Sequence, residues 1–311
     1  ISGELAREWL QAATNANGQK NELVLRPTLN GDDFNGTRPD KWVVDFGPTM
    51  SEHDASFFEA PFEHIRATVK GYRQRLKDDG TFAVRAKNER EIWWRHARAR
   101  PALRKAIAHL DRYIATPMVS TYRNFGFLET SVLPDQKLVI FARDDFTFFG
   151  ILESRFHLAW TIATCSWIGS GNDITYAKNS VFETFPFPEG LTPDIPASDY
   201  ADDPRAIAIA EAAKELNDKR EAWLNPQDLV RRAPEVVEGY PDRLLPVDAA
   251  AEKELKKRTL TNLYNARPAW LDGLHAHLDA AVARAYGWPE DISEDNALAH
   301  LVALNHARAE K

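Results

Sequence analysis

The sequence has 311 residues, of which 44% are hydrophobic, so it is long enough for about two domains with sizeable cores. Its one cysteine, Cys165, excludes a disulfide within the chain and predicts a reducing, cytoplasmic setting. No apolar run reaches the ~18 residues of a membrane helix, and the first residues lack the pattern of a signal peptide, so we expect no membrane partner.

The N-terminal part predicts short helices around one strand. A helix is expected at 4–13, and Asn30-Gly31 has the composition of a tight turn between extended segments. Residues 41–47 predict a strand. Pro61 is expected in the first turn of a helix that runs to about residue 77, and Pro101 opens another helix.

Strands and an apolar helix follow. β-Branched and aromatic residues, broken by prolines and a glycine, predict three or four short strands over 112–142. The spacing of apolar residues over 147–164 predicts one helix. The stretch "NSVFETFPFPEG" (179–190) then carries two Phe-Pro pairs, which favour a stiff, extended backbone, so we expect its aromatic rings to be buried.

The composition changes after residue 190. Residues 191–205 are rich in proline and aspartate and predict a linker. Beyond them the pattern predicts helices at 206–224, 248–264, 269–286 and 294–309. The expected fold class is therefore α+β, with a mixed α/β domain at 1–190 followed by a mostly helical C-terminal domain at 206–311.

Basic residues are concentrated in one segment of an acidic chain. Residues 60–125 carry 15 Lys and Arg against six Asp and Glu, a net charge of +9, which leaves −16 for the rest of a chain of net charge −7. Such a block is typical of a phosphate-binding surface, although like charges also gather on solvated helix faces. Trp93 and Trp94 lie within the block, and such aromatic residues fit either nucleic-acid binding or a core.

The sequence contains no convincing set of catalytic or metal-binding residues. His275 and His277 are two residues apart on an expected helix, so they face different sides. Gly169-Ser170-Gly171 follows a helix and precedes a strand, the reverse of the order in a cofactor-binding loop, so we interpret it as a flexible loop. Asp242 and the run Glu254-Leu255-Lys256 resemble a metal-dependent nuclease signature, but the run lies in a sequence that strongly favours a helix.

The remaining signals favour binding to double-stranded DNA. Side chains aimed at base edges give sequence choice, whereas Arg and Lys contacts to phosphates give affinity. The residues that we predict to read bases are Asn172, Asp173, Thr175, Lys178, Thr121 and Arg123. The residues that we predict to contact the DNA backbone are Arg66, Lys70, Arg73, Arg95, Arg98, Arg104 and Lys105. Taken one by one, each also fits a solvated loop or helix position.

Six strings along the chain form an ordered set, among them "APFEHIRATVK", "VLPDQKLVIFARDDFTFFGILESRFHLAW" and "GNDITYAKNSVFETFPFPEG". Together they resemble the C-terminal part of large single-chain bacterial DNA methyltransferases of the MmeI-like type, which are restriction-modification enzymes. The resemblance covers nearly the whole chain, and it is the ordered set that makes it specific.

The resemblance implies that residues 1–190 are a target recognition domain that reads bases from the segment just before the Phe-Pro pairs. It also implies adenine-N6 methylation with S-adenosylmethionine by the intact enzyme, whose methyltransferase domain, a partner in the same parent chain, precedes this region. That domain's cofactor loop and catalytic motif are absent here, so we expect no cofactor in this chain and no activity from it alone. Members of the family often carry a basic residue after "IATP", where this chain has Met118, so Arg123 is expected to supply that phosphate contact.

Two other functions fit parts of the sequence. The acidic helical region also fits a protein-interaction or scaffolding module, whose partner binding would survive charge reversal at Arg95, Arg98 and Arg104. The nuclease-like residues would instead predict Mg²⁺-dependent cutting that depends on Glu254.

Overall fold

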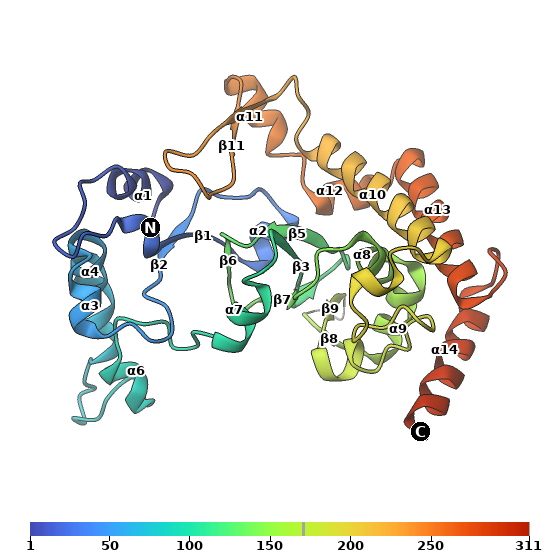
Figure 1. Ribbon diagram of the computed structural model, residues 1–311, viewed down its shortest axis with the longest axis horizontal. Coiled ribbons are helices and arrows are strands. Elements are labelled where there is room, and N and C mark those ends of the chain that lie inside the picture. Colours follow the sequence, from blue (N-terminus) through green and yellow to red (C-terminus); the bar gives the residue numbers. More distant parts are fainter. Residues whose placement is uncertain (170–171, 311) are drawn as a thin grey trace.

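The computed structural model describes residues 1–169 and 172–310, and its α+β class confirms the expectation from the sequence. Small sheets lie in the middle of the molecule, with N-terminal helices at one end and C-terminal helices at the other (Figure 1). Within the described ranges, no helix combines the length and the hydropathy that a membrane crossing needs.

The N-terminal part contains one antiparallel strand pair among short helices. Its elements are α1 (Gly3–Leu10), η1 (Asn21–Leu23), β1 (Leu25–Leu29), α2 (Gly31–Asn35), β2 (Trp42–Val44), α3 (Glu52–Ser56), α4 (Glu59–Ile65), a π-helical turn η2 (Arg66–Lys70), α5 (Gly71–Arg73) and α6 (Lys87–Glu91). The helix that we expected to run from Pro61 to about residue 77 is thus broken by the π-helical turn and ends at Arg73.

Asn30 begins a helix, so its prediction as part of a hairpin turn is wrong. Its side chain accepts a hydrogen bond from the Asp33 amide at 2.9 Å, and the Asp33 carboxylate accepts one from the Asn30 amide at 3.4 Å. This reciprocal capping box satisfies backbone groups at the start of α2. The Asn-Gly pair alone does not distinguish a cap from a turn.

Two three-stranded sheets form the central region. In the first, β3 (Arg112–Pro117) lies between β5 (Gly126–Glu129) and β7 (Leu138–Phe141) and is antiparallel to both. The second has the order β4 (Val119–Ser120), β9 (Asp173–Thr175), β8 (Ser166–Ile168). β6 (Leu133–Pro134) pairs in parallel with β1 and so joins the N-terminal strands to the centre. The strand-rich character predicted for 112–142 is confirmed.

The helix expected at 147–164 is two helices, α8 (Phe146–Glu153) and α9 (Arg155–Thr164). Ser154 separates them, because its extended backbone (φ −68°, ψ 152°) ends α8 and its hydroxyl accepts a hydrogen bond from the His157 amide at 3.4 Å. Apolar residues continue through both helices, so periodicity alone does not reveal the break.

The Phe-Pro stretch is buried, as predicted. Phe185 is 5% exposed and Phe187 is 2% exposed. The Phe187 ring stacks on Phe148 of α8 with 5.5 Å between centroids, and Phe185 lies edge-on to His157 of α9 at 4.8 Å. These contacts fix the chain that leaves β9 through the π-helical turn η3 (Lys178–Phe182).

The C-terminal region is helical except for one hairpin that the sequence did not predict. Its elements are η4 (Ala197–Tyr200), α10 (Pro204–Leu224), β10 (Val230–Ala233), β11 (Arg243–Pro246), α11 (Ala249–Leu255), α12 (Leu260–Ala266), α13 (Ala269–Tyr286) and α14 (Glu294–Ala309). The helix expected at 248–264 is divided, because Thr259 caps α12. α10 packs closely on α8 at Gly150, where a β-carbon would lie 2.6 Å from Ile209 Cγ2.

Two hydrophobic cores hold these elements. The larger runs from Leu29 to Leu301 and joins the β5-β3-β7 sheet to the helices that follow it. The smaller is built from residues between Ala6 and Trp93, and apolar residues of the loop between β10 and β11 pack on it. The division into domains at 1–190 and 206–311 stays a prediction, and the larger core extends across it.

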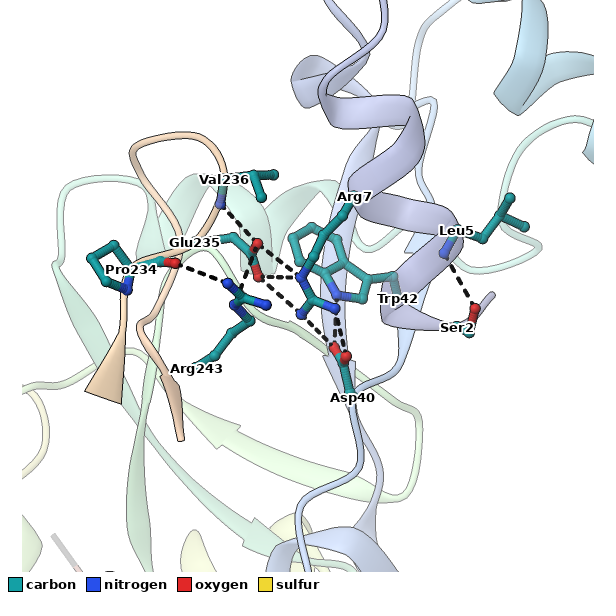
Figure 2. A network of polar contacts seen from close by, with 9 residues as sticks. All are labelled: Ser2, Leu5, Arg7, Asp40, Trp42, Pro234, Glu235, Val236 and Arg243. Atoms are coloured by element: carbon teal, nitrogen blue, oxygen red, sulfur yellow. Dashed lines mark hydrogen bonds and ion pairs between the residues drawn. The ribbon is translucent and has the colours of Figure 1, made fainter. Parts of the chain in front are cut away.

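The loop between β10 and β11 is also tied to the N-terminal part by a polar network (Figure 2). The Glu235 carboxylate accepts a hydrogen bond from Arg7 Nε at 3.0 Å, and Arg7 Nη1 donates to Asp40 at 2.7 Å. The Tyr240 hydroxyl donates to the Glu22 carbonyl at 2.8 Å. The C-terminal region therefore fastens the N-terminal helices in place.

Candidate functional site

The β4-β9-β8 sheet brings together residues from two predicted base-reading segments. Val119 lies opposite Thr175, and Ile168 lies opposite Asp173. The Thr121 hydroxyl donates a hydrogen bond to Asp173 Oδ1 at 2.8 Å, which continues the β4-β9 register by one pair. Opposite residues in such pairs share a face, and alternate residues along a strand do too. One face of this sheet, which we call the β4-β9-β8 face, therefore carries Val119, Thr121, Ser166, Ile168, Asp173 and Thr175.

The structure places four of the predicted base-reading residues on or beside the β4-β9-β8 face. Thr121 is exposed, while Asp173 and Thr175 are half-buried. Asn172 is exposed in the turn that precedes β9. Lys178 lies further away at the start of η3, where its ammonium pairs with Glu183 at 2.9 Å. Within Gly169-Ser170-Gly171, the last two residues lie outside the described ranges.

Arg123 is buried, which corrects its prediction as a base-reading or phosphate-binding residue. It is 7% exposed, and its guanidinium donates hydrogen bonds to Thr116 Oγ1 at 2.9 Å, to the Pro117 carbonyl and to the Ile174 carbonyl at 2.9 Å. Burial lowers the pKa of Arg123 to about 10. Its role is structural, since it joins the end of β3 to β9 underneath the β4-β9-β8 face.

A buried ion pair holds the far end of the turn at residues 121–125, which connects β4 to β5 and contains both Thr121 and Arg123. Glu153 of α8 and Arg220 of α10 meet at 2.7 Å, with side chains 1% and 3% exposed. The Phe125 amide donates to Glu153 at 2.7 Å, and Arg220 donates to the Phe125 carbonyl at 2.9 Å. The ion pair thus fixes both the backbone amide and the backbone carbonyl of Phe125. No local motif in the sequence reveals this role, because the two charges are 67 residues apart.

A buried histidine, His157 of α9, positions Tyr176, the residue that directly follows β9. The Leu152 carbonyl lies 2.9 Å from His157 Nδ1, and the Tyr176 hydroxyl lies 3.0 Å from His157 Nε2. The two contacts fit a neutral ring that donates from Nδ1 and accepts from Tyr176. Burial lowers the pKa of His157 to about 3, which keeps the ring neutral. Tyr176 directly follows β9, so His157 anchors that strand.

Three of the predicted backbone-contacting residues are used within the fold. Arg104 donates to the Asp45 carboxylate at 2.6 and 3.0 Å, Arg73 donates to the Arg95 carbonyl at 2.8 Å, and Arg95 donates to the carbonyl of Pro48. These contacts hold the basic segment against the smaller core. Contact of these three residues with DNA stays a prediction.

The other four predicted backbone-contacting residues are more accessible. Arg66 pairs with Glu63 on an exposed helix surface, and Lys70 lies 4.8 Å from the centre of the Trp93 ring. Arg98 and Lys105 are exposed and form no ion pair with any described residue. They lie just before and within α7 (Pro101–Ile107), which begins at Pro101 as expected.

The nuclease-like residues do not converge as a metal site would require. Glu254 is on α11, as the sequence predicted, and its carboxylate pairs with Lys257 at 3.3 Å. Across the described ranges, no group of three or more His, Cys, Asp or Glu side chains is placed to hold a metal ion. Glu254 therefore has the surroundings of a helix surface residue.

Residues 83–189 match the family model described as the MmeI target recognition domain. The chain has an MmeI-like recognition segment. The matched residues run from just before α6 to the end of the Phe-Pro stretch, so they include every predicted base-reading residue and four of the predicted backbone contacts, Arg95, Arg98, Arg104 and Lys105. The resemblance inferred from the ordered strings is confirmed.

A solved structure of the Type IIL restriction-modification enzyme MmeI in complex with DNA is similar in fold. Its TM-score is 0.65 and its sequence identity 17%, over 100% of this chain and 34% of that chain. The present chain thus spans about a third of the length of the MmeI-like structure, and the match extends to the helical region beyond the recognition segment. No curated protein matches the sequence.

Proposed function

We propose that this chain is the DNA sequence-recognition portion of an adenine-N6 DNA methyltransferase that uses S-adenosylmethionine and belongs to a restriction-modification system. The observation that carries the proposal is the Thr121–Asp173 contact within the MmeI-like segment. It brings two separate segments, both predicted to read bases, onto one sheet face. A rigid face with donors and acceptors at fixed positions is what direct readout of base edges needs.

The exposed basic residues supply the second requirement, which is attraction to the phosphates. Arg98 and Lys105 are exposed just before and within α7, and in Figure 1 α6, α7 and β8 follow one another along the lower side of the molecule. A duplex lying along that side would meet the basic segment and the β4-β9-β8 face together. Phosphate contacts would then set position and affinity, while the face would select sequence.

The parent protein would supply the chemistry. We propose a methyltransferase domain in the same parent chain as the partner that holds S-adenosylmethionine, in a cytoplasmic setting. The solved structure that is similar to this chain is about three times as long, which leaves room for such a domain. The present chain carries no catalytic motif, so methyl transfer is expected only from the intact enzyme.

A salt titration of duplex binding tests the proposal. The chain should bind a labelled duplex at low salt, and log Kd should rise linearly with log salt concentration. The double variant Arg98→Ala/Lys105→Ala should lower the slope by about 2, because each lost phosphate contact removes ~0.9. Lys219→Ala/Lys253→Ala, two exposed lysines of α10 and α11, is the matched control and should leave the slope unchanged. Absence of binding at low salt, or equal slopes in both double variants, would argue against the proposal.

A further inference from the structure

The β4-β9-β8 face carries apolar as well as polar side chains. Val119 is 37% exposed and Ile168 is 45% exposed, although both are β-branched apolar residues. The register places Val119 beside Thr175, and Ile168 beside Asp173. Each apolar residue therefore has a predicted base-reading residue as its direct cross-strand neighbour, at a Cβ separation of roughly 5 Å.

The opposite face of the same sheet differs in character. Ile174 is 4% exposed and Ser120 is 8% exposed, whereas Trp167 of β8 is 45% exposed, so that face packs against the protein at β4 and β9 but not at β8. The exposure of Val119 is thus not a general property of β4, because its neighbour Ser120 on the other face is buried, whereas β8 is exposed along its length.

The Asp173 carboxylate, on the central strand β9, restricts what the β4-β9-β8 face can contact. The Asp173 carboxylate accepts the Thr121 hydroxyl on Oδ1, which orients it and leaves Oδ2 with no hydrogen-bond donor among the described residues. A carboxylate repels phosphates, so its nucleic-acid partner must be a donor on a base edge. In the major groove these donors are adenine N6 and cytosine N4. In the same groove, the only methyl group of the four bases is the thymine 5-methyl.

We propose that Ile168 and Val119 read thymine 5-methyl groups in the major groove, beside an amino group bound by Asp173. The inference rests on the proposed function. It adds that the face enters the major groove, that Ile168 and Val119 read bases, and that the base they read is thymine. Removing a methyl group and an apolar side chain from water together is favourable, and the thymine 5-methyl group is accessible only in the major groove. A thymine next to an amino-bearing base is thus the feature that this face fits.

The test replaces thymine by deoxyuridine, which removes only the methyl group. Duplexes bound by the chain are first selected from a random pool, and each thymine of the enriched sequence is then replaced in turn. At one or two positions the wild-type chain should lose about fourfold in affinity, the effect of one buried methyl group. Ile168→Ala or Val119→Ala should bind the thymine duplex more weakly and should no longer distinguish thymine from deoxyuridine at its position. Val302→Ala, at an exposed apolar residue of α14, is the control and should retain the full discrimination.

The outcomes separate the inference from the proposed function. If a sequence is enriched but no thymine position responds to deoxyuridine, the methyl contact is wrong and DNA recognition stands. If discrimination persists unchanged in both alanine variants, Ile168 and Val119 are not the reading residues. If the chain binds no duplex, both the inference and the proposed function fail.

Discussion

The Thr121 hydroxyl donates to the Asp173 carboxylate at 2.8 Å, and this contact joins segments that are 52 residues apart in the sequence. Thr121 follows β4 and Asp173 begins β9, so the hydrogen bond sets where the carboxylate points on the β4-β9-β8 face. Within the same turn, Arg123 donates to the Ile174 carbonyl of β9, and the Glu153–Arg220 pair holds Phe125 at the far end of the turn. A surface contact is thus supported by buried charges on the same turn, on α8 and on α10.

Loss of the Thr121 hydroxyl should relax sequence choice more than affinity. In Thr121→Val the Asp173 carboxylate is no longer oriented, whereas the exposed lysines and arginines are unchanged. We expect the ratio of the random-duplex Kd to the specific Kd to fall by about tenfold, as for one base-reading contact of about 1–3 kcal/mol, and the random-duplex Kd to stay within about twofold. Thr121→Ser keeps a donor and should restore the ratio. An equal loss for both duplexes would show that Thr121 acts on affinity or folding alone.

Phe185→Ala should destabilise the protein by about 3–5 kcal/mol, because it removes a fully packed ring from the larger core. Phe185 is 5% exposed and contacts His157 and Phe187 edge-on. Tyr72→Ala removes a ring that is 65% exposed and should change the free energy of unfolding by less than about 0.5 kcal/mol. Urea unfolding of both variants gives the comparison. Similar values for the two would mean that the Phe-Pro stretch does not brace the recognition segment.

Arg220→Met should cost about 3–5 kcal/mol, because it leaves the Glu153 carboxylate buried without its charged partner. The double variant Glu153→Leu/Arg220→Met removes both charges and should recover a large part of that loss. Urea unfolding of the two single variants and the double variant gives the coupling energy. Additive effects in this cycle would contradict the close pairing at 2.7 Å.

Acid should weaken the fold through His157. In the unfolded chain a histidine takes up a proton near pH 6.5, whereas burial holds the folded pKa at about 3. Between about pH 6.5 and pH 3 the folded state therefore binds fewer protons at His157 than the unfolded state. The contribution of neutral His157 to the free energy of unfolding is complete above about pH 6.5 and declines by about 1.4 kcal/mol for each pH unit below it. His157→Gln should flatten the slope of unfolding free energy against pH by that amount between pH 6 and 4. The exposed His53→Gln should not change the slope.

Features that depend on local sequence were predicted well. The bounds of α13 and α14 agree with the apolar spacing, and the two prolines of the Phe-Pro stretch correctly indicated buried rings. The same local reasoning missed the division between α8 and α9, because the apolar residues around Ser154 continue without interruption. It also missed β10 and β11, whose loop finds its partners near the N-terminus through Glu235 and Tyr240.

The candidate site was predicted in composition but not in geometry. Asp173 and Thr121 were identified as polar residues suited to base edges, yet only the sheet register shows that they touch. Arg123 is predicted at the surface because arginine is usually exposed, whereas acceptors on Thr116 and Pro117, and the carbonyl of Ile174 from 51 residues further along the chain, allow its burial. Long-range pairings of this kind leave no periodic trace in a single sequence.

Selection of duplexes from a random pool tests the central claim most directly. The account predicts that the 311-residue chain enriches one defined sequence, and that Asp173→Asn alters the preferred base at one position of it while random-duplex binding and the free energy of unfolding stay nearly unchanged. Binding to duplexes without enrichment of any sequence, or an identical preference in the Asp173→Asn variant, would contradict the claim that the β4-β9-β8 face reads DNA.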